Sequence, residues 1–566
     1  MIRATFSGFS TAFSALQASQ KRLDIVGQNL SNMNTQGYTR QQLETSSLNY
    51  CNPISRYMNG SQIAVGFGVS MDKVSQIRDP YLDAQYRAQI NKSGYSDTLQ
   101  TALDTLSKAL DESSIEGIRT AFDDVQSTLT NLQDKGNDSV YESELRSRMQ
   151  SLTNLLNDAA RQIEEAEKAE LSKLDGTGTS EQGSVDKVND ILRQIGNLNH
   201  QIKQNQVLGQ QSLELLDERN SLLDELASYI PIEVTYFKDA EHDGKMTVAD
   251  PDDPDAPAHI IDAPKELYNY DSKGNIISRK EWPDDLKVEL VYRDTTDPEG
   301  TTRRLTLING TEGTLGSNYG KLTPVDSDPS DPTAVSIQFT PASSSGQTAK
   351  SASATGIQLA SGSIQASLDM LGKKGTGDPV APGSSVQDNV RGYQYYMKRL
   401  DELASHFAKI MNDANAEGGQ GKLLANRTDP AADITALTIG ISKEWINGTV
   451  HLGKKDGSSK DTVLSMLNNM KKDHPELGNK SFADYMNNVS TILANDSSSN
   501  INALKTNVTV LNSIQDSRDS ISGVSLDEEA SNMMTYLSAY NAASRLMTAL
   551  DEALNTLISG TGLVGR

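Results

Sequence analysis

Two apolar stripes lie near opposite ends of the chain. Near its start, large apolar residues recur mostly at steps of three, four or seven, the spacing of a coiled-coil seam. These residues are Phe6, Phe9, Phe13, Leu16, Leu23 and Leu30. The pattern predicts a helix over about 5–30. A polar stretch up to Gly37 then ends it, because Asn, Ser and Thr compete for backbone hydrogen bonds and Gly permits a positive φ.

The second stripe belongs to a predicted helix from about 526 to 558. Ser525 and Glu528 have the spacing of a capping box, and acidic residues occupy the first turn, where the helix dipole favours them. Two neighbouring apolar rows follow. One contains Met533, Leu537, Tyr540, Met547, Leu554 and Ile558, and the other Tyr536, Ala539, Ala543, Leu546, Leu550, Ala553 and Leu557. One partner helix would not cover so wide a face, so we expect several neighbouring helices.

Neither terminal helix buries enough apolar surface to offset the entropy of ordering about thirty residues. We therefore expect a subunit that polymerises through its ends, with both ends largely disordered until assembly. The alternative is a hairpin in which the two helices pair within one chain. The pattern alone does not decide between them.

Between the ends, the hydrophobic period changes twice. Leu99, Leu103, Leu106 and Leu110 exemplify a helical spacing from Pro80 to about Tyr229, with a loop at 175–183. Alternation typical of strands follows, at 232–236, 286–292, 304–308 and 335–339, with a hairpin over 268–277 and a flexible tether over 341–356. Helical spacing resumes over 389–415 and, with breaks, over 464–521.

These changes predict a mainly α protein with an inserted β domain that projects outward. The predicted organisation has three parts: a terminal helical polymerisation domain (1–50 and 522–566), a helical rod domain (51–230 and 355–521) and a β-rich surface insert (231–354).

Composition narrows the possible functions. The 566 residues carry a net charge of −23, which disfavours nucleic acid and anionic membranes as partners. Cys51 is the single cysteine, so an intrachain disulfide is impossible. No run approaches the roughly 18–20 apolar residues of a membrane-spanning helix, and the first helix does not resemble a cleavable signal peptide. We expect no membrane insertion.

Motifs for catalysis are not found. The six histidines lack metal-binding spacing, and neither a phosphate-binding loop nor a nucleophile elbow occurs. We expect no catalytic residues, no cofactor and no enzymatic activity. One speculative calcium loop has acids at Asp239, Glu241, Asp243 and Asp250. Pro251 argues against it, and a solvated acidic turn is the simpler interpretation.

Several ordered sequence blocks carry a family resemblance. The first is Asn29-x-x-Asn32-x-x-Thr35-x-Gly37-Tyr38, and later blocks lie at 77–87, 198–202, 215–226, 391–404, 522–529 and 540–545. Together they resemble the flagellar axial proteins, the family of rod, hook and hook-associated subunits, with the hook-associated members most similar. Glu214 and Leu537-Ser538 depart from the usual pattern, which puts in doubt the transfer of subunit contacts there.

The resemblance implies a structural junction adaptor that connects hook to filament and is needed for filament assembly. The protein would lie outside the cell, in the bacterial flagellum, after type III export without a cleaved signal peptide. Implied partners are itself in a ring-like assembly, hook protein, a second hook–filament junction protein and a cytoplasmic export chaperone that binds Leu546, Leu550 and Leu554.

The resemblance also implies that the terminal helices pair as a coiled-coil-like core domain inside the polymer. The expected packing residues are the six of the first seam, the motif residues Asn29, Asn32, Thr35, Gly37 and Tyr38, and, in the last helix, Met533, Leu537, Tyr540, Leu546, Met547, Leu550, Leu554 and Leu557. Two alternatives remain: a hook-type axial subunit, disfavoured by the long helical region 80–230, and a polymer-borne extracellular binding module that uses the β insert.

Overall fold

The computed structural model describes most of the chain. The described residues are 2–47, 68–110, 112–135, 139–176, 182–207, 212–238, 245–248, 259–262, 268–270, 276–279, 284–294, 301–310, 318–326, 335–342, 347–352, 357–372, 390–453 and 461–561. The speculative calcium residues and Cys51 lie outside them.

Helices make up most of the described structure. They are α1 (Ile2–Ser31), α3 (Pro80–Ala109), α4 (Glu112–Lys135), α5 (Ser139–Asp175), α6 (Ser184–Val207), α7 (Leu213–Tyr229), α8 (Ser363–Gly372), α9 (Tyr393–Glu417), α10 (Lys443–Ile446), α11 (Thr462–Lys471), the 3-10 turn η2 (Pro475–Leu477), α12 (Phe482–Ser522) and α13 (Leu526–Thr561). The last helix therefore extends three residues past the expected end at 558, and the helix expected from 389 begins at Tyr393.

The strands form several small antiparallel sheets. They are β1 (Gln41–Ser47), β2 (Val69–Gln76), β3 (Ile232–Lys238), β4 (Lys245–Val248), β5 (His259–Asp262), β6 (Tyr268–Tyr270), β7 (Ile276–Arg279), β8 (Asp284–Asp294), β9 (Thr302–Asn309), β10 (Lys321–Asp326), β11 (Val335–Thr340), β12 (Lys350–Ala352), β13 (Ile357–Leu359), β14 (Leu424–Asn426) and β15 (Ile439–Ile441).

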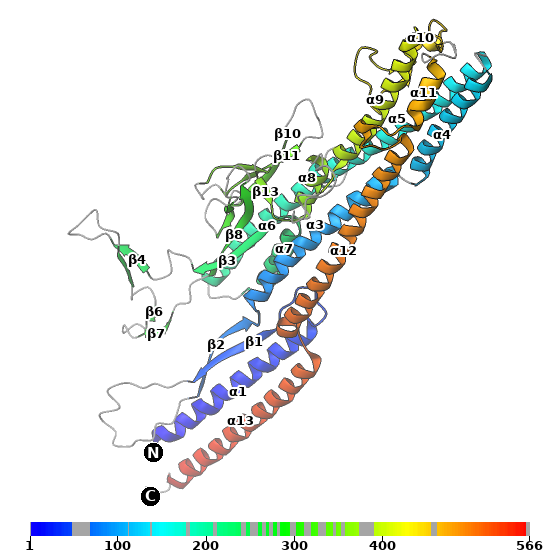
Figure 1. The fold of residues 1–566 in the computed structure, drawn as a ribbon. Helices are drawn as coiled ribbons and strands as arrows, with labels where there is room; N and C mark the ends of the chain where they lie inside the picture. The colour runs from blue at the N-terminus through cyan, green and yellow to red at the C-terminus, as the bar shows by residue number, and fades with distance from the viewer. Residues whose placement is uncertain are drawn as a thin grey trace.

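The helices pack side by side along a long rod, and the sheets of 232–359 project from one side (Figure 1). The two chain ends meet at one end of the rod, where α1 and α13 run antiparallel side by side. Helices α3 and α12 form the middle, and α4, α5, α9 and α11 form the other end. The prediction of a mainly α fold with an inserted β region and contacting terminal helices is confirmed.

An apolar core holds the far end of the rod together. Phe122, Phe407 and Phe482 come from three different helices, and their ring centroids lie 5.3–5.7 Å apart. Leu99, Leu103 and Leu106 of α3 belong to the same buried core. Helix α3 begins where Pro80 predicts it, because the Asp79 carboxylate accepts a hydrogen bond from the Tyr81 backbone N–H.

The main sheet has the order β13-β8-β3, with β9 also paired to β8. Its alternating apolar residues Leu286, Val288 and Leu290 are buried, and α6 contacts the sheet. The predicted tether is wrong in part, since β12 lies inside it and pairs with β11. Strand β13 extends the sheet beyond residue 354, and the β1–β2 hairpin beside α1 was not predicted. Its short strands lack a clear alternation of apolar residues.

The fully buried apolar residues of α1 are not the large residues of the predicted seam. The buried apolar residues of α1 are Ala12, Ala18, Ile25 and Val26, whereas Phe13 is 51% exposed. A Cβ atom added at Gly8 would lie 3.4 Å from Leu550 of α13, so small residues allow a close approach. The helices pair within one chain, and α1 also contacts β1 and β2.

A histidine pair near the far end predicts acid sensitivity. His406 contacts His474, with ring centroids 4.7 Å apart, and its side chain is 11% exposed. Burial, assisted by the charges of His474 and Lys409, lowers the pKa of His406, and the opposing charge of Glu476 does not cancel this.

The unfolded chain therefore takes up the His406 proton first as pH falls. The free energy of unfolding is expected to decrease below about pH 6.5, the ordinary His pKa. Urea unfolding of the wild type and His406→Gln at pH 7.5 and 5.5 tests this. The substitution should flatten the pH dependence, and exposed His451→Gln should not. Equal slopes for the wild type and His406→Gln would contradict the prediction.

Candidate functional site

The joint between the terminal helices and the rod begins at Asn29. This side chain is buried near the end of α1; its Nδ2 donates to the Gln41 carbonyl, and its Oδ1 accepts from the Gln41 N–H, both at 3.0 Å. The Tyr38 hydroxyl also donates to Oδ1, at 2.9 Å. Burial, with nearby Asp217, Glu214 and Glu529, raises the pKa of Tyr38 to about 12, so this donor stays protonated at neutral pH. The Asn29 carboxamide thus makes the two hydrogen bonds to the Gln41 backbone that a neighbouring strand would otherwise make.

The other motif residues shape the turn between α1 and β1. Asn32 Nδ2 donates to the Gln28 carbonyl, and the Thr35 hydroxyl donates to Asn32 Oδ1 at 3.2 Å. Gly37 has a φ of +80°, a conformation that favours glycine. The motif therefore encodes a defined turn.

Thr39 connects this turn to the rod. Its N–H and hydroxyl donate to the Asp217 carboxylate of α7, at 3.1 and 2.6 Å. Arg78 lies 3.6 Å from the same carboxylate and donates through two nitrogens to Asp83, both at 3.1 Å. Burial tends to raise the pKa of Asp83, but the Arg78 hydrogen bonds and the charges of Arg78, Arg518 and Arg87 lower it overall. For Asp217 burial prevails, and its pKa is raised.

Arg518 brings the end of α12 into the same cluster. Its guanidinium lies 2.8 Å from Asp83 and 2.7 Å from Asp224, and it stacks 4.8 Å from the centre of the Tyr86 ring. Arg87 also bonds Asp224, at 2.8 Å. One arginine therefore links α12 to both α3 and α7, just before the chain continues into α13.

Arg40 ties the start of α13 to β1. Its Nη1 lies 2.6 Å from Glu528, and its N–H donates to the Ser522 carbonyl at 2.9 Å. The capping-box pattern suggested that Glu528 would bond back towards Ser525. Its carboxylate pairs instead with this arginine, which the fold brings within reach.

The joint, as we call this cluster, comprises Asn29, Thr39, Arg40, Arg78, Asp83, Asp217, Asp224, Arg518 and Glu528. Its residues come from four of the sequence blocks, at 29–38, 77–87, 215–226 and 522–529, together with Thr39 and Arg40, which directly follow the first block, and Arg518. Sequence reasoning missed the role of Arg518, because an arginine among acidic neighbours is common and only the fold shows which carboxylates it reaches.

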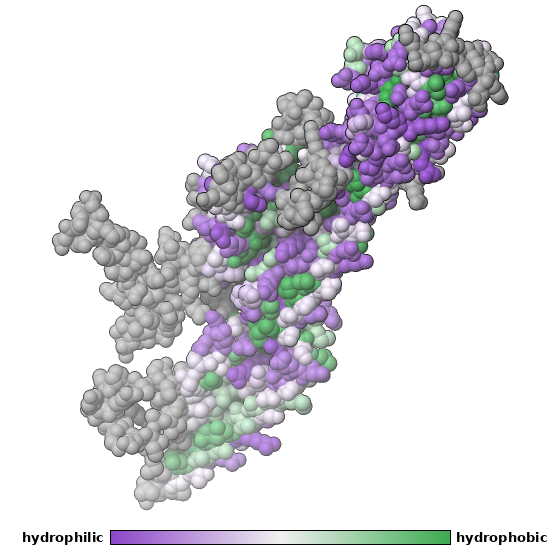
Figure 2. Space-filling model, viewed as in Figure 1, coloured by the Kyte–Doolittle hydropathy of each residue, from purple (hydrophilic) through white to green (hydrophobic). Residues whose placement is uncertain are grey.

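The remaining residues expected in the polymer core lie along the terminal helices. Those half-buried in the single chain are Phe9, Leu16, Leu23, Leu30, Tyr540, Met547, Leu550 and Leu554. Exposed ones are Phe13, Met533, Leu537, Leu546 and Leu557, and the side chain of Phe6 lies outside the described residues. Figure 2 shows apolar patches, interspersed with polar residues, on the visible face of the end of the molecule where α13 lies. One side of α13 packs on α1, and apolar residues on another side of α13 remain exposed.

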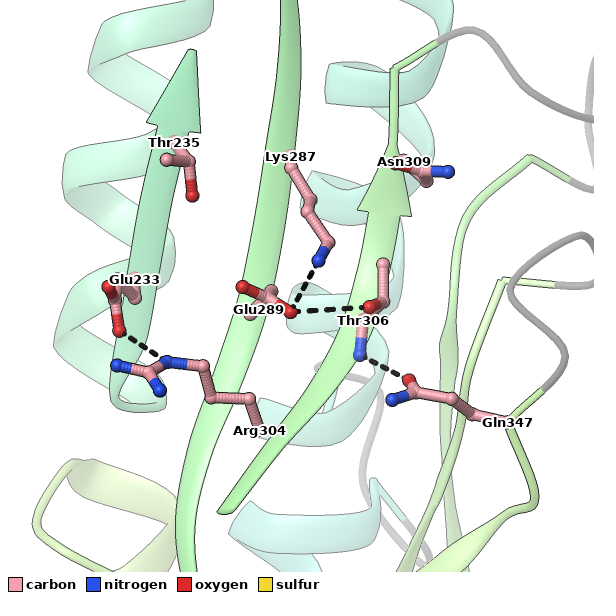
Figure 3. Close-up of a pocket in the computed structure, with 8 residues that line it drawn as sticks. All are labelled: Glu233, Thr235, Lys287, Glu289, Arg304, Thr306, Asn309 and Gln347. Carbon is pink, nitrogen blue, oxygen red and sulfur yellow. Dashed lines mark hydrogen bonds and ion pairs between the residues drawn. The ribbon is translucent and has the colours of Figure 1, made fainter. Parts of the chain in front are cut away.

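A polar face of the main sheet bears on the alternative of a binding module. Its lining includes Glu233, Lys287, Glu289, Arg304 and Gln347 (Figure 3). Arg304 pairs with Glu233 at 2.7 Å, Lys287 with Glu289 at 2.8 Å, and Gln347 accepts from the Thr306 N–H. These groups satisfy one another, so the face does not favour a ligand.

The described residues contain neither a candidate metal site nor a candidate membrane-spanning helix. Within the described residues, no group of three or more His, Cys, Asp or Glu side chains could hold a metal ion. None of the helices in the described parts of the chain is long and apolar enough to cross a membrane.

Comparisons with known proteins match both ends and the rod. The model "Flagella basal body rod protein" matches 9–39, and "Flagellar basal body rod FlgEFG protein C-terminal" matches 515–560. "Flagellar hook-associated protein FlgK helical domain" matches 103–250. The terminal matches and the paired helices define the class, an axial protein of the bacterial flagellum.

Two full-length relatives have the same name. Flagellar hook-associated protein 1 of Bacillus subtilis (strain 168) is 27% identical over 586 aligned residues, covering 100% of both chains. The Salmonella typhimurium protein of the same name is 22% identical and covers 97% of this chain and 98% of its own. Over nearly its whole length the chain is similar to flagellar hook-associated protein 1, and its residues 103–250 match the FlgK helical-domain model. It is a structural, non-enzymatic component of the flagellum, located outside the cell.

One solved structure aligns with part of this chain. The flagellar hook junction protein FlgK from Burkholderia pseudomallei aligns with 61% of this chain and 46% of its own chain, at 19% identity and a TM-score of 0.38.

Proposed function

We propose that this protein forms the junction between hook and filament, as a ring-like assembly of its own copies. The observation that carries the proposal is the apolar surface of α13 that the single chain leaves uncovered, including Leu537, Leu546 and Leu557. An exposed apolar surface of this kind marks an interaction site. The joint anchors the helix pair to the rod, so that force on the polymer core passes to the outer part.

The proposed organisation has a terminal polymerisation domain (1–50 and 522–566), a rod domain (51–230 and 355–521) and a surface insert (231–354). Hook protein would contact one end of the ring and a second junction protein the other. Before export, a cytoplasmic chaperone would cover α13 at Leu546, Leu550 and Leu554, which prevents premature polymerisation. Export by the type III route would need no cleaved signal peptide.

Electron microscopy of cells that lack this gene tests the junction role, together with an assay for flagellin in the medium. Hooks without filaments, with flagellin shed as monomer, are expected. Intact filaments would overturn the proposal. Absent hooks would point instead to a hook-type subunit. Restoring the gene on a plasmid controls for effects on neighbouring genes.

The free subunit is expected to exchange its terminal amide hydrogens quickly. Among the described residues of α13, Ala543 is the one buried apolar side chain, so the α1–α13 pair has little core of its own. Local opening of such a pair costs little free energy. Hydrogen exchange on monomer should show weak protection over 4–30 and 527–558 and strong protection over 99–106. Strong protection of both terminal segments would refute this prediction.

A further inference from the structure

A polar groove of about 710 Å³ lies where α1, β1 and the first turns of α13 meet. Its lining includes Arg22, Asn29, Arg40, Gln41, Glu529 and Tyr536. The motif that builds the joint thus also builds this groove.

Among the residues that the structure describes, three buried polar atoms of this lining have no hydrogen-bond partner: Arg40 Nε, Gln41 Nε2 and Glu529 Oε2. Gln41 is 7% exposed and Glu529 is 3% exposed, so neither side chain is simply solvated. Buried polar groups are almost always hydrogen-bonded, because an unmade bond costs the desolvation of the group. The groove therefore offers two donors and one acceptor to an occupant.

The chemistry of these atoms selects a carboxamide. Asn and Gln side chains carry both a carbonyl acceptor and an NH₂ donor, which matches the two kinds of unpaired atom. A carboxylate has no donor for Glu529 Oε2 and would meet Glu44, Asp72 and Glu528 in the lining, whereas a cationic side chain has no acceptor for Arg40 Nε and Gln41 Nε2. A neutral carboxamide provides both functions.

The chain itself exposes carboxamide side chains at the end of α1, close to the groove. The turn after α1 contains Asn34 and Gln36, both exposed, and no charged residue lies between Asp24 and Arg40. In the chain's own structure these two side chains are not among those that line the groove. The turn and the groove both lie at the end of α1. When two copies lie side by side, the turn of one copy would therefore reach the groove of the other copy.

We propose that the groove of one copy receives the carboxamide turn, residues 31–36, of a second copy. This inference rests on the proposed function, in which copies assemble around the terminal helices. The contact joins two different surfaces, and such head-to-tail contacts generate rings or helical arrays. It would connect neighbouring subunits directly to the joint.

Cysteine cross-linking of assembled flagella tests the contact. In a Cys51→Ser background, Asn34→Cys is combined with Asn532→Cys, which lines the groove. Oxidation should give a ladder of covalent multimers, absent from each single-cysteine variant and from a control pair of Asn34→Cys with exposed Lys505→Cys. Filaments without a ladder would overturn the inference while leaving the junction role intact. An equal ladder from the control pair would also overturn it.

A second variant separates the contact from folding. Gln41→Leu removes one unpaired donor and preserves the backbone bonds with Asn29. We expect an unchanged or higher unfolding midpoint for the free subunit, and a roughly tenfold weaker association between copies, the order of effect of a lost hydrogen bond in a buried contact. Should the Asn34/Asn532 pair fail to assemble, Gln36→Cys with Thr45→Cys replaces it. Unchanged association of Gln41→Leu subunits would contradict the proposal.

Discussion

Leu546→Asp is expected to abolish filament formation while leaving the free subunit almost as stable as the wild type. Leu546 is 48% exposed on α13, so the substitution should change the free energy of unfolding by less than about 1 kcal/mol. In the assembly, burying this leucine would contribute ~1.5–3 kcal/mol per copy, and a buried aspartate would add a desolvation cost. The penalty recurs in every copy of the ring, which makes the expected effect large.

Circular dichroism of purified protein and electron microscopy of complemented cells measure the two effects. Ile446→Asp, at an exposed residue of α10 far from the terminal helices, is the matched control and should form filaments. Leu550→Asp differs from both, because Leu550 lies against Gly8 of α1, and it should also loosen the helix pair. Normal filaments with Leu546→Asp would overturn the assignment of this face to assembly.

Arg518→Met is expected to weaken the connection between rod and terminal helices by about 3 kcal/mol, the lower end of the cost of breaking a buried ion pair. Asp83 and Asp224 would each lose a close cation, although Arg78 and Arg87 would remain beside them. Methionine preserves much of the apolar stem that lies over Tyr86. The measurement is urea unfolding together with hydrogen exchange over 510–522.

Lys505→Met controls for the loss of a positive charge from α12, since Lys505 is exposed on the same helix. The pH dependence gives a second readout. Because the pKa of Asp83 is lowered in the fold, its stabilisation is present above the unfolded pKa of about 3.9 and is lost as pH falls below it. Arg518→Met should reduce this acid sensitivity. Wild-type stability and an unchanged acid response would show that the arginine contributes little.

The sequence alone determined most of the helices, the main strands and the family resemblance. Periods of 3.6 and 2 separate the helical rod from the strands, because a helix or strand must turn one side to a core whatever its partner. Ordered blocks such as Asn29 to Tyr38 indicated an axial flagellar subunit before any contact was known. Local chemistry also placed helix starts, as at Asp79-Pro80.

Only the tertiary structure decided which residues meet. Spacing cannot show that Thr39 bonds Asp217, that Arg518 reaches Asp83 and Asp224, or that Glu528 pairs with Arg40. Those pairs are separated by up to 488 residues. On α1 the predicted seam consists of large residues, yet the fully buried apolar residues are Ala12, Ala18, Ile25 and Val26, in a helix that contacts β1 and β2 as well as α13. Gly8 of α1 permits a close approach of Leu550 in α13. How closely two helices approach depends on the side chains of both helices, so neither apolar stripe alone can predict it.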